Sequence, residues 1–404
     1  MESLKINQKY VLITSSNFPA GGAGANYLNL FCKGLIINGF FIRVFLLKGF
    51  AFGSFANKSS RKNITEYGTP YTYLGFTKRP RYKFFKLCDE FISVFSVIGL
   101  LFSLLNQRKT TTILLYNSEI QFNIPIFLFA YLFRIKIVTF IPEFYDKSVF
   151  SGSFFRRLKW YGFLINFSYL NKISNKLIVF SHFLKNEYIK RDFNESDIII
   201  QPNLTDFEYW ITKEAEIKYT IGYSGTPSVK DGLYDLFKAI SLLKNKTFHV
   251  DLLVIGDSTF GNSLIPELKI ECQKLGILEK VTFTGLVESS MVKKYLSECK
   301  ILAITRPSTK QTKAGFPTKL GEYFATKRPV LTTDFGDIEK YFDSGVDIVM
   351  AESGNPESIA LKIKWMIENN EISDQIAQRG VQKAKELLDY NKSVTRMIQI
   401  INEK

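Results

Sequence analysis

The sequence predicts an α/β protein built from two Rossmann-like domains. Three observations support this fold class: short apolar runs recur along the chain, helical patterns alternate with them, and a charged stretch separates two such series. Apolar runs that alternate with helices are typical of parallel sheets covered on both faces. The 404 residues also exceed one typical domain, so we expect two domains of about 150–200 residues each.

The first series begins with an apolar strand at Tyr10–Ser15, a glycine-rich loop at residues 17–26 and a helix at Tyr27–Asn38. Strand, glycine loop and helix in this order open a parallel α/β unit. Residues 49–82, rich in Gly, Ser, Lys and Tyr, are expected to form a long loop. The further strands expected here are Phe40–Leu47, Thr112–Tyr116, Lys136–Ile141 and Lys176–Phe180.

A charged stretch without clear periodicity, Thr212–Lys218, is expected to link the two domains. The strands expected after it are Ile221–Ser224, His249–Ile255, Val281–Thr284, Ile301–Thr305, Val330–Thr333 and Asp347–Met350, with helices at Gly232–Leu243, Ser289–Glu298 and Lys319–Ala325. We therefore expect a first domain over residues 1–211 and a second over 219–387, facing each other across a cleft. A C-terminal helix is expected at about residues 388–404, and packing back on the first domain is one of its two alternative positions.

The cysteine and histidine counts argue against several classes of site. Four scattered cysteines without a C-x-x-C pair argue against a disulfide framework or a zinc site and fit a reducing compartment. Two histidines are too few for a multi-histidine metal centre. The polar start of the chain predicts no secretory signal. The longest apolar run, residues 91–105, is shorter than the roughly 20 residues that a membrane span needs, so we interpret it as a core helix or an interfacial segment.

The positive charge is concentrated in the first half of the chain. The net charge is +15, of which residues 1–210 carry +13, and such a charge favours an anionic partner. Basic and aromatic residues alternate in Lys78–Lys86 and Phe154–Tyr169, a combination suited to a lipid headgroup layer. We therefore expect a cytoplasmic protein whose first domain docks peripherally on the anionic inner face of the cell membrane. The alternative is a core helix with a solvated basic face.

Three glycines follow the first strand, in the loop at residues 19–24. Glycine lets backbone N–H groups approach an oxyanion, and the following helix N-terminus adds its dipole. Gly21 and Gly22 are therefore candidate ligand-binding residues. A tight strand-to-helix turn is the alternative.

The segment at residues 304–330 carries the strongest functional pattern. Arg306 follows a buried strand, and Pro317–Thr318 are typical helix-start residues. Lys319 and Glu322 are three residues apart and so share one helix face. A cation and a carboxylate placed in this way can hold a diphosphate and its ribose hydroxyls. A weak surface ion pair is the alternative.

The block GFPTKLGEYFATKRPVLTT at residues 315–333 resembles the donor-site motif of the GT-B glycosyltransferases of family 4. Residues 15–28 resemble the glycine loop of that family, Pro202–Asp206 its Pro-Asn-x-x-Asp motif, and Tyr223–Leu233 the opening of its nucleotide domain. The resemblance implies a GT-B fold and a retaining transferase without a metal cofactor. Its donor would be a UDP- or GDP-linked sugar, bound by the second domain, and its acceptor a glycan or lipid-linked glycan, bound by the first.

The resemblance also assigns roles to single residues. Arg306 and Lys319 would stabilise the leaving diphosphate. Ala314 stands where the family has its first glutamate. Where the family's N-terminal histidine is missing, the best acid and hydroxyl candidates are Glu143, Tyr145 and Asp146, with a buried structural role as the alternative for Glu143. The remaining donor-binding candidates are Gly21, Gly22, Gly225, Lys230, Gly315, Phe316, Pro317, Thr318 and Glu322.

Two other functions stay open on the sequence alone. One is a nucleotide-sugar epimerase or hydrolase on the same fold, which needs no acceptor. The other is a basic nucleic-acid-binding protein. We expect no nucleic-acid partner, because no recognised nucleic-acid module is present and the aromatic residues fall in apolar helix and strand patterns. The oligomeric state is open.

Overall fold

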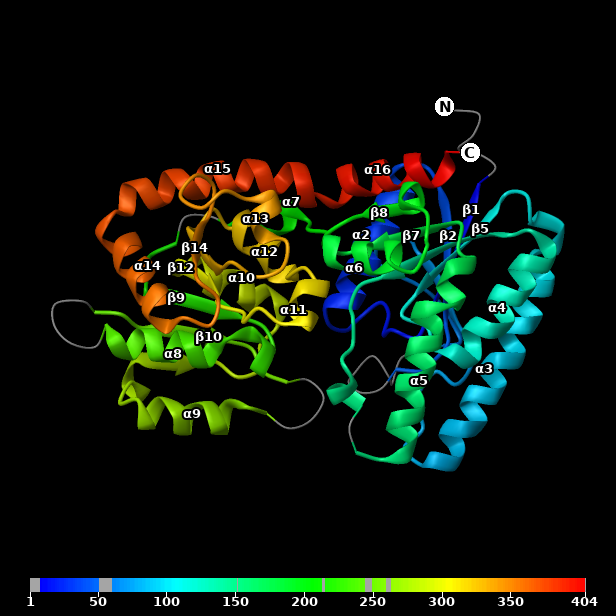
Figure 1. Cartoon of the computed structure of the whole chain (residues 1–404), viewed down its shortest axis with the longest axis horizontal. Coiled ribbons are helices and arrows are strands. Elements are labelled where there is room, and N and C mark those ends of the chain that lie inside the picture. The colour runs from blue at the N-terminus through cyan, green and yellow to red at the C-terminus, as the bar shows by residue number, and fades with distance from the viewer. Residues whose placement is uncertain are drawn as a thin grey trace. The chain divides into compact units, whose positions relative to one another are not determined.

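The computed structural model describes residues 8–50, 60–150, 152–212, 215–243, 249–258 and 263–403 (Figure 1). The chain folds into two compact units, of which unit 1 is Met1–Leu204 with Tyr390–Lys404 and unit 2 is Thr205–Asp389. The division precedes the expected boundary at residue 211, because Phe207 of helix α7 (Phe207–Trp210) is buried in the core of unit 2. The expected linker, Thr212–Lys218, accordingly lies inside unit 2, where the Lys218 N–H donates to the Glu298 carbonyl.

Unit 1 contains an eight-stranded sheet in the order β3-β4-β2-β1-β5-β6-β7-β8, in which only β3 and β4 pair antiparallel. The strands are β1 (Lys9–Thr14), β2 (Phe41–Leu46), β3 (Lys62–Ile64), β4 (Pro70–Tyr73), β5 (Thr111–Tyr116), β6 (Lys136–Ile141), β7 (Lys176–Val179) and β8 (Ile198–Ile200). β3 and β4 correct the expected loop at residues 49–82. They and β8 were not expected, and β3 and β4 lie in a segment that is rich in Gly, Ser, Lys and Tyr.

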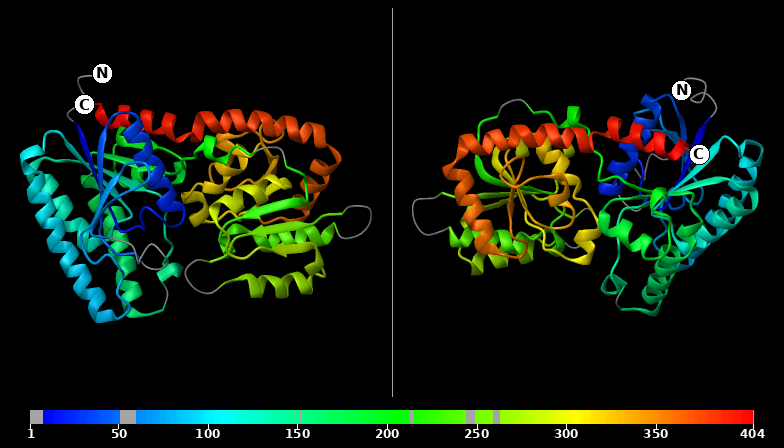
Figure 2. Two further views of the ribbon diagram at one scale, coloured as in Figure 1. Left: turned by 180° about the vertical axis from the view of Figure 1, so that it is seen from behind. Right: turned by 45° about the horizontal axis from the view of Figure 1, so that its top comes forward.

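Helices cover both faces of this sheet (Figures 1 and 2). Helices α2 (Ala23–Ile37) and α16 (Tyr390–Asn402) share one core with it, so the C-terminal helix belongs to unit 1. Helices α3 (Lys83–Leu104) and α4 (Ile120–Phe133) build the core of the other face. Helix α5 (Phe154–Ser168) packs beside α4, and α6 (His182–Ile189) connects β7 to β8.

Helix α3 is longer than the apolar run in its sequence. Together with the following turn it covers Lys83–Gln107, and by length and composition it is long and apolar enough to cross a membrane. One face of α3 is nevertheless built into unit 1: Asp89, Ser93, Val97 and Leu101 are buried at four-residue spacing. The Asp89 carboxylate accepts a hydrogen bond from the Phe76 N–H, and the Ser93 hydroxyl donates to the Leu47 carbonyl.

Unit 2 contains a six-stranded parallel sheet in the order β11-β10-β9-β12-β13-β14. The strands are β9 (Tyr219–Ser224), β10 (Leu252–Ile255), β11 (Val281–Phe283), β12 (Cys299–Ile304), β13 (Val330–Thr333) and β14 (Val349–Ala351). Helices α8 (Leu233–Leu242), α9 (Ile265–Lys274) and α14 (Pro356–Glu368) pack on one face. Helices α7, α10 (Ser289–Ser297), α12 (Thr318–Ala325), α13 (Ile338–Tyr341) and α15 (Asn370–Leu388) pack on the other, and α11 (Lys310–Ala314) precedes α12.

Candidate active site

The expected donor-site residues of unit 2 lie around the carboxyl ends of β9 and β12. β9 pairs with β10 on one side and with β12 on the other, so the direction in which strands are added reverses here. Parallel α/β sheets bind ligands at the carboxyl ends of such strands. Gly225 directly follows β9, and Arg306 follows β12 by two residues. Two sequence-predicted residues that are 81 positions apart are thus brought to one edge.

Asp231 is the centre of a charged cluster at this edge. Its Oδ1 accepts hydrogen bonds from Arg306 Nε at 3.2 Å, Arg306 Nη2 at 3.0 Å and Lys319 Nζ at 3.3 Å. Its Oδ2 accepts from the Ser228 hydroxyl at 2.5 Å. The Asp231 and Lys319 side chains are only 3% and 9% exposed. Both cations were predicted from the sequence, but the carboxylate that holds them was not.

The charges in this cluster are strongly coupled. Burial lowers the pKa of Lys319 to about 8, with Arg306 adding to the decrease and Asp231 opposing it. Burial also disfavours ionisation of Asp231, but Lys319 and Arg306 outweigh that effect and hold the pKa of the carboxyl well below its usual range. Two cations therefore share one buried carboxylate. This leaves a positive charge in a partly desolvated position, where an anionic ligand would be bound strongly.

Two glycines are required by this arrangement. A Cβ at Gly225, whose φ is +124°, would lie 3.0 Å from Lys319 Nζ, so glycine leaves room for the ammonium group at the end of β9. A Cβ at Gly232 would lie 1.7 Å from the Thr305 carbonyl oxygen. Close approach of that turn to the end of β12 is what brings Asp231 to Arg306.

Helix α12 carries Glu322 one turn after Lys319. Burial raises the pKa of Glu322 to about 7, although the charge of Lys319 opposes the increase. The helix is fixed to β9 because the Ser224 N–H donates to the hydroxyl oxygen of Tyr323 at 2.7 Å. Glu322 is thus a largely buried carboxylate on a firmly held helix, and its ionised form would accept hydrogen bonds from ligand hydroxyl groups.

The loop before α12 is held in place by packing of Phe316. Phe316 is buried and packs edge-to-face on Tyr341, and Pro317 occupies the N-cap position. Within the described residues no side chain caps α12, so its first turn has N–H groups that suit an anion. Ala314 is fully buried, and Gly315 and Thr318 flank Phe316–Pro317 as expected. Lys230 precedes Asp231 and contributes to lowering its pKa.

Comparison with known proteins agrees with this geometry. Residues 218–369, which include Asp231, Arg306, Lys319 and Glu322, match the family model described as glycosyl transferases group 1. HepE of Anabaena, solved in complex with UDP, is 16% identical with a TM-score of 0.73, and the match covers 97% of this chain and 98% of that chain. The chain has the GT-B glycosyltransferase fold. Comparison with curated proteins gives no match.

Other GT-B structures match the chain over its full length as well. Sucrose-phosphate synthase of Thermosynechococcus elongatus is 14% identical with a TM-score of 0.73, covering 97% of this chain and 98% of that chain. The lipopolysaccharide outer core galactosyltransferase WaaB is 12% identical with a TM-score of 0.63, covering 98% of this chain and 99% of that chain. At these identities the structures show the fold.

The remaining expected residues of this GT-B chain lie in unit 1. Gly22 is the N-cap of α2, and a Cβ there would meet nothing within 4 Å, so the loop after β1 has open space beside it. Gly21 precedes it in the same loop. Glu143 follows β6 and is hydrogen-bonded to the Tyr145 hydroxyl, and this contact together with burial raises the pKa of Tyr145.

A cavity of about 70 Å³ with a mixed polar and apolar lining lies beside Glu143, at the carboxyl ends of β5 and β6. Asn117, Ser118 and Asn166 also line it. The Oδ1 atom of Asn166 is buried and has no hydrogen-bond partner within the described part of the chain. A buried hydrogen-bond acceptor of this kind requires a hydrogen-bond donor from a ligand or a water molecule. The cavity is therefore the best candidate in unit 1 for the site of the expected glycan acceptor.

Unit 1 contains a second charged cluster, which was not predicted from the sequence. Lys48 pairs with Glu119 and lies 3.9 Å from Glu90, and the Ser15 hydroxyl donates to Glu119 at 2.7 Å. Ser15, Lys48 and Glu119 each follow a strand, namely β1, β2 and β5, so they meet at the same carboxyl edge. Their position directly after strand ends is the sequence signal from which this cluster could have been predicted.

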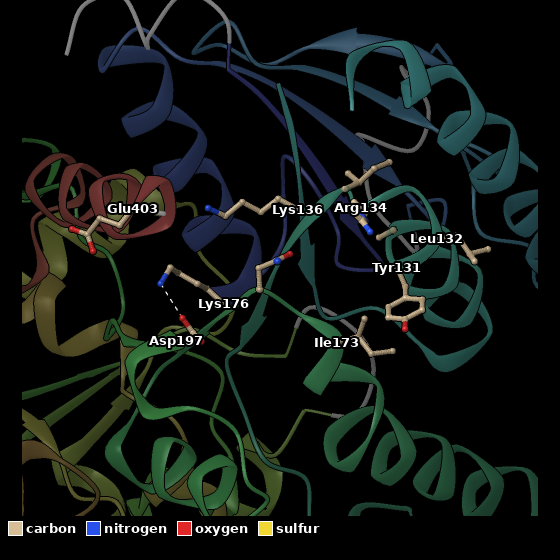
Figure 3. Close-up of a pocket in the computed structure, with 11 residues that line it drawn as sticks. Tyr131, Leu132, Arg134, Lys136, Ile173, Lys176, Asp197 and Glu403 are labelled. Atoms are coloured by element: carbon tan, nitrogen blue, oxygen red, sulfur yellow. Dashed lines mark hydrogen bonds and ion pairs between the residues drawn. The ribbon is translucent and has the colours of Figure 1, made fainter. Parts of the chain in front are cut away.

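A larger hollow of about 900 Å³ lies at the opposite edge of this sheet, where β6 and β7 begin (Figure 3). Lys176 Nζ pairs with Asp197 at 3.2 Å, and Lys136 Nζ donates to the Ile401 carbonyl of α16. Burial and the nearby Lys176 lower the pKa of Lys136. No three His, Cys, Asp or Glu residues within the described segments form a group able to hold a metal ion.

Proposed function

We propose that the protein is a glycosyltransferase that moves a sugar from a nucleoside-diphosphate sugar to a hydroxyl group of a glycan acceptor. The observation that carries this proposal is the buried Asp231 cluster with Arg306 and Lys319, one helical turn from Glu322. All four lie in the segment that matches the glycosyltransferase group 1 model. UDP is the favoured nucleotide, because HepE was solved with UDP and with UDP-glucose.

In this mechanism the diphosphate competes with Asp231 for its two cations. Arg306 and Lys319 then stabilise the negative charge that grows on the diphosphate as its bond to the sugar breaks. Ionised Glu322 accepts hydrogen bonds from the ribose hydroxyls. With these cations in place we expect no metal requirement, so initial rates should not change in EDTA. Retention of the anomeric configuration is proposed from the resemblance to family 4.

The acceptor is proposed to bind unit 1, at the cavity beside Glu143. We propose a lipid-linked or surface-polysaccharide intermediate, of the kind found in capsule, O-antigen or exopolysaccharide assembly, at the cytoplasmic face of the cell membrane. Two observations support it: the +13 charge of residues 1–210, and the fold shared with WaaB, a lipopolysaccharide outer core galactosyltransferase.

Binding of UDP and uridine to single variants tests the donor site. Arg306→Ala and Lys319→Ala should each weaken UDP binding about tenfold or more and change uridine binding little, because charge-assisted hydrogen bonds contribute roughly 1.5–3 kcal/mol. Lys340→Ala, an exposed lysine of unit 2, is the control and should bind both as the unmodified protein does. Equal losses for UDP and uridine would show that the two cations only shape the pocket.

Product analysis with a panel of sugar nucleotides separates the alternatives. A transferase forms a new glycoside only when acceptor is present. An epimerase or hydrolase changes the sugar nucleotide without acceptor. Binding to oligonucleotides with a steep salt dependence, and no response to UDP, would instead indicate a nucleic-acid-binding protein.

A further inference from the structure

Helices α3, α4 and α5 form a layer on one side of unit 1 (Figures 1 and 2). Large apolar side chains are exposed on the outer surface of this layer. The exposed fraction is 71% for Phe95, 72% for Tyr131 and 55% for Tyr161. We call this surface the apolar face. Its members are Phe91, Ile92, Phe95 and Phe102 of α3, Ile124, Leu128, Tyr131 and Leu132 of α4, and Leu158, Tyr161 and Ile165 of α5.

The centre of the apolar face has no charge. Residues 91–104, 120–133 and 160–171 contain no Asp, Glu, Lys or Arg. A surface helix of a globular protein normally carries charged residues on the side away from the core. Three adjacent helical segments without any, and with large hydrophobic side chains in their place, mark a surface that binds another molecule or a membrane.

Basic residues border the apolar face at both ends. The three helices run in the same direction, because β5, β6 and β7 that follow them are parallel. Within the described part of residues 78–172, thirteen exposed charged side chains are basic and one, Asp146, is acidic. The basic ones are Lys78, Arg79, Arg81, Lys83, Lys86, Lys147, Arg156, Arg157 and Lys159 near the helix starts, and Arg108, Lys109, Arg134 and Lys172 after the helix ends.

We infer that unit 1 binds an anionic membrane with the apolar face lying flat on the leaflet, so that α3, α4 and α5 are parallel to the bilayer. This rests on the membrane location in the proposed function and adds the surface and its orientation. The apolar side chains enter the boundary between headgroups and acyl chains, and the bordering cations reach lipid phosphates. If only the basic N-terminal ends of α3 and α5 entered the headgroup layer, α4 would remain in water.

Two other uses of the apolar face fit the structure less well. Crossing of the bilayer by α3 would remove its buried side, with Asp89 and Ser93, from unit 1. A second copy of the chain would place the same basic border against itself, because a two-fold interface pairs a patch with its own copy. A membrane with anionic lipids is complementary to both parts, because its acyl chains contact the apolar centre and its headgroups contact the basic border.

The orientation also links the membrane to the candidate acceptor site. Helix α5 contributes Tyr161 to the apolar face and Asn166 to the cavity beside Glu143. Where α4 ends, Tyr131 and Leu132 line the same hollow as Lys136 and Lys176 (Figure 3). This hollow is large enough to hold a phosphate headgroup. A lipid-linked acceptor held in the leaflet would thus meet the cavity at the depth of the headgroups.

Co-sedimentation of the full chain with vesicles of phosphatidylcholine, with and without phosphatidylglycerol, tests the inference. Leu128→Ser with Tyr131→Ser removes exposed apolar groups from α4, and binding to the anionic vesicles should fall about tenfold or more. Arg156→Glu with Arg157→Glu should lose binding mainly at low salt. The matched control, Ile270→Ser with Leu361→Ser on exposed positions of unit 2, should bind as the unmodified chain does.

Depth is measured with a Leu128→Trp chain and lipids brominated on their acyl chains. Flat insertion predicts quenching beyond that of the parent chain and its three tryptophans. Unchanged binding of the α4 double variant, or no extra quenching, would overturn the inference in favour of docking by the helix starts. A lipid-free dimer that the α4 variant converts to a monomer would overturn it in favour of a second copy. UDP affinity should be the same in every variant, so failure of the donor site is seen separately.

Discussion

At the scale of single residues, Glu322, the proposed ribose ligand, has a cost in stability. Its pKa is raised from 4.5 to about 7, so between these values the folded protein holds a proton that the unfolded chain has lost. The free energy of unfolding therefore falls as pH rises through this window. Glu322→Gln should unfold with a free energy up to about 3 kcal/mol higher at pH 8, and with little difference at pH 4.

Urea unfolding at both pH values, followed by UDP titration at pH 8, measures this prediction. UDP affinity of the Gln variant should fall by about 10- to 150-fold, because an amide cannot replace the charged acceptor. A variant that is no more stable at pH 8 would mean that the carboxyl is well solvated. Unchanged UDP affinity in the folded variant would remove Glu322 from the ribose site.

The candidate site could be predicted from the sequence where its residues are close in the chain. Arg306, Lys319 and Glu322 lie within one segment that has a helix-start pattern, and each was found. Asp231 was missed because its hydrogen bonds reach Arg306 across 75 positions and Lys319 across 88. A single carboxylate in a short turn shows no periodicity, and only the fold reveals what it contacts.

At the scale of elements, packing of α16 on α2 completes unit 1. Val394, Met397, Ile398 and Ile401 of α16 enter the core that α2 shares with the sheet. The sequence predicted a C-terminal helix, but its place depends on the fit of side chains far apart in the chain. Apolar strands whose two faces are both buried were predicted even where they have only three or four residues. β3 was missed because it is polar and largely exposed, and β4 lies in the same segment, which was interpreted as a loop.

Gly34 allows this close packing. A Cβ at Gly34 would lie 2.8 Å from the Cβ of Val394, whose branched side chain has little freedom to move. Gly34→Ala should therefore lower the free energy of unfolding of unit 1 by about 1–3 kcal/mol. Adding Val394→Ala should recover part of the loss by relieving the overlap. Chemical denaturation followed by circular dichroism measures both.

Gly99 of α3 provides the matched control, because a Cβ there would meet nothing within 4 Å. Gly99→Ala should be neutral or stabilise the protein by about 0.4–1 kcal/mol, as alanine favours the helix. If Gly34→Ala were as harmless as Gly99→Ala, α16 would not pack on α2 at this distance.

At the scale of the whole molecule, the chain passes between the two units after Leu204 and again after Asp389. Proteins with more than one domain commonly unfold in more than one step. Arg306, Lys319 and Glu322 of the proposed donor site lie in unit 2, whereas Gly34 lies in unit 1. A ligand that binds one unit stabilises that unit, so heat and ligand can be used to assign the donor site to its unit.

Scanning calorimetry with and without UDP carries out this assignment. UDP at 100 times its Kd stabilises its unit by about 2.7 kcal/mol, which raises the Tm of a unit of this size by roughly 5–10 °C. We expect UDP to raise the Tm of one transition, and Gly34→Ala to lower the Tm of the other. If UDP instead raised the transition that Gly34→Ala lowers, the nucleotide would bind unit 1, and the Arg306 and Lys319 cluster would not be the donor site.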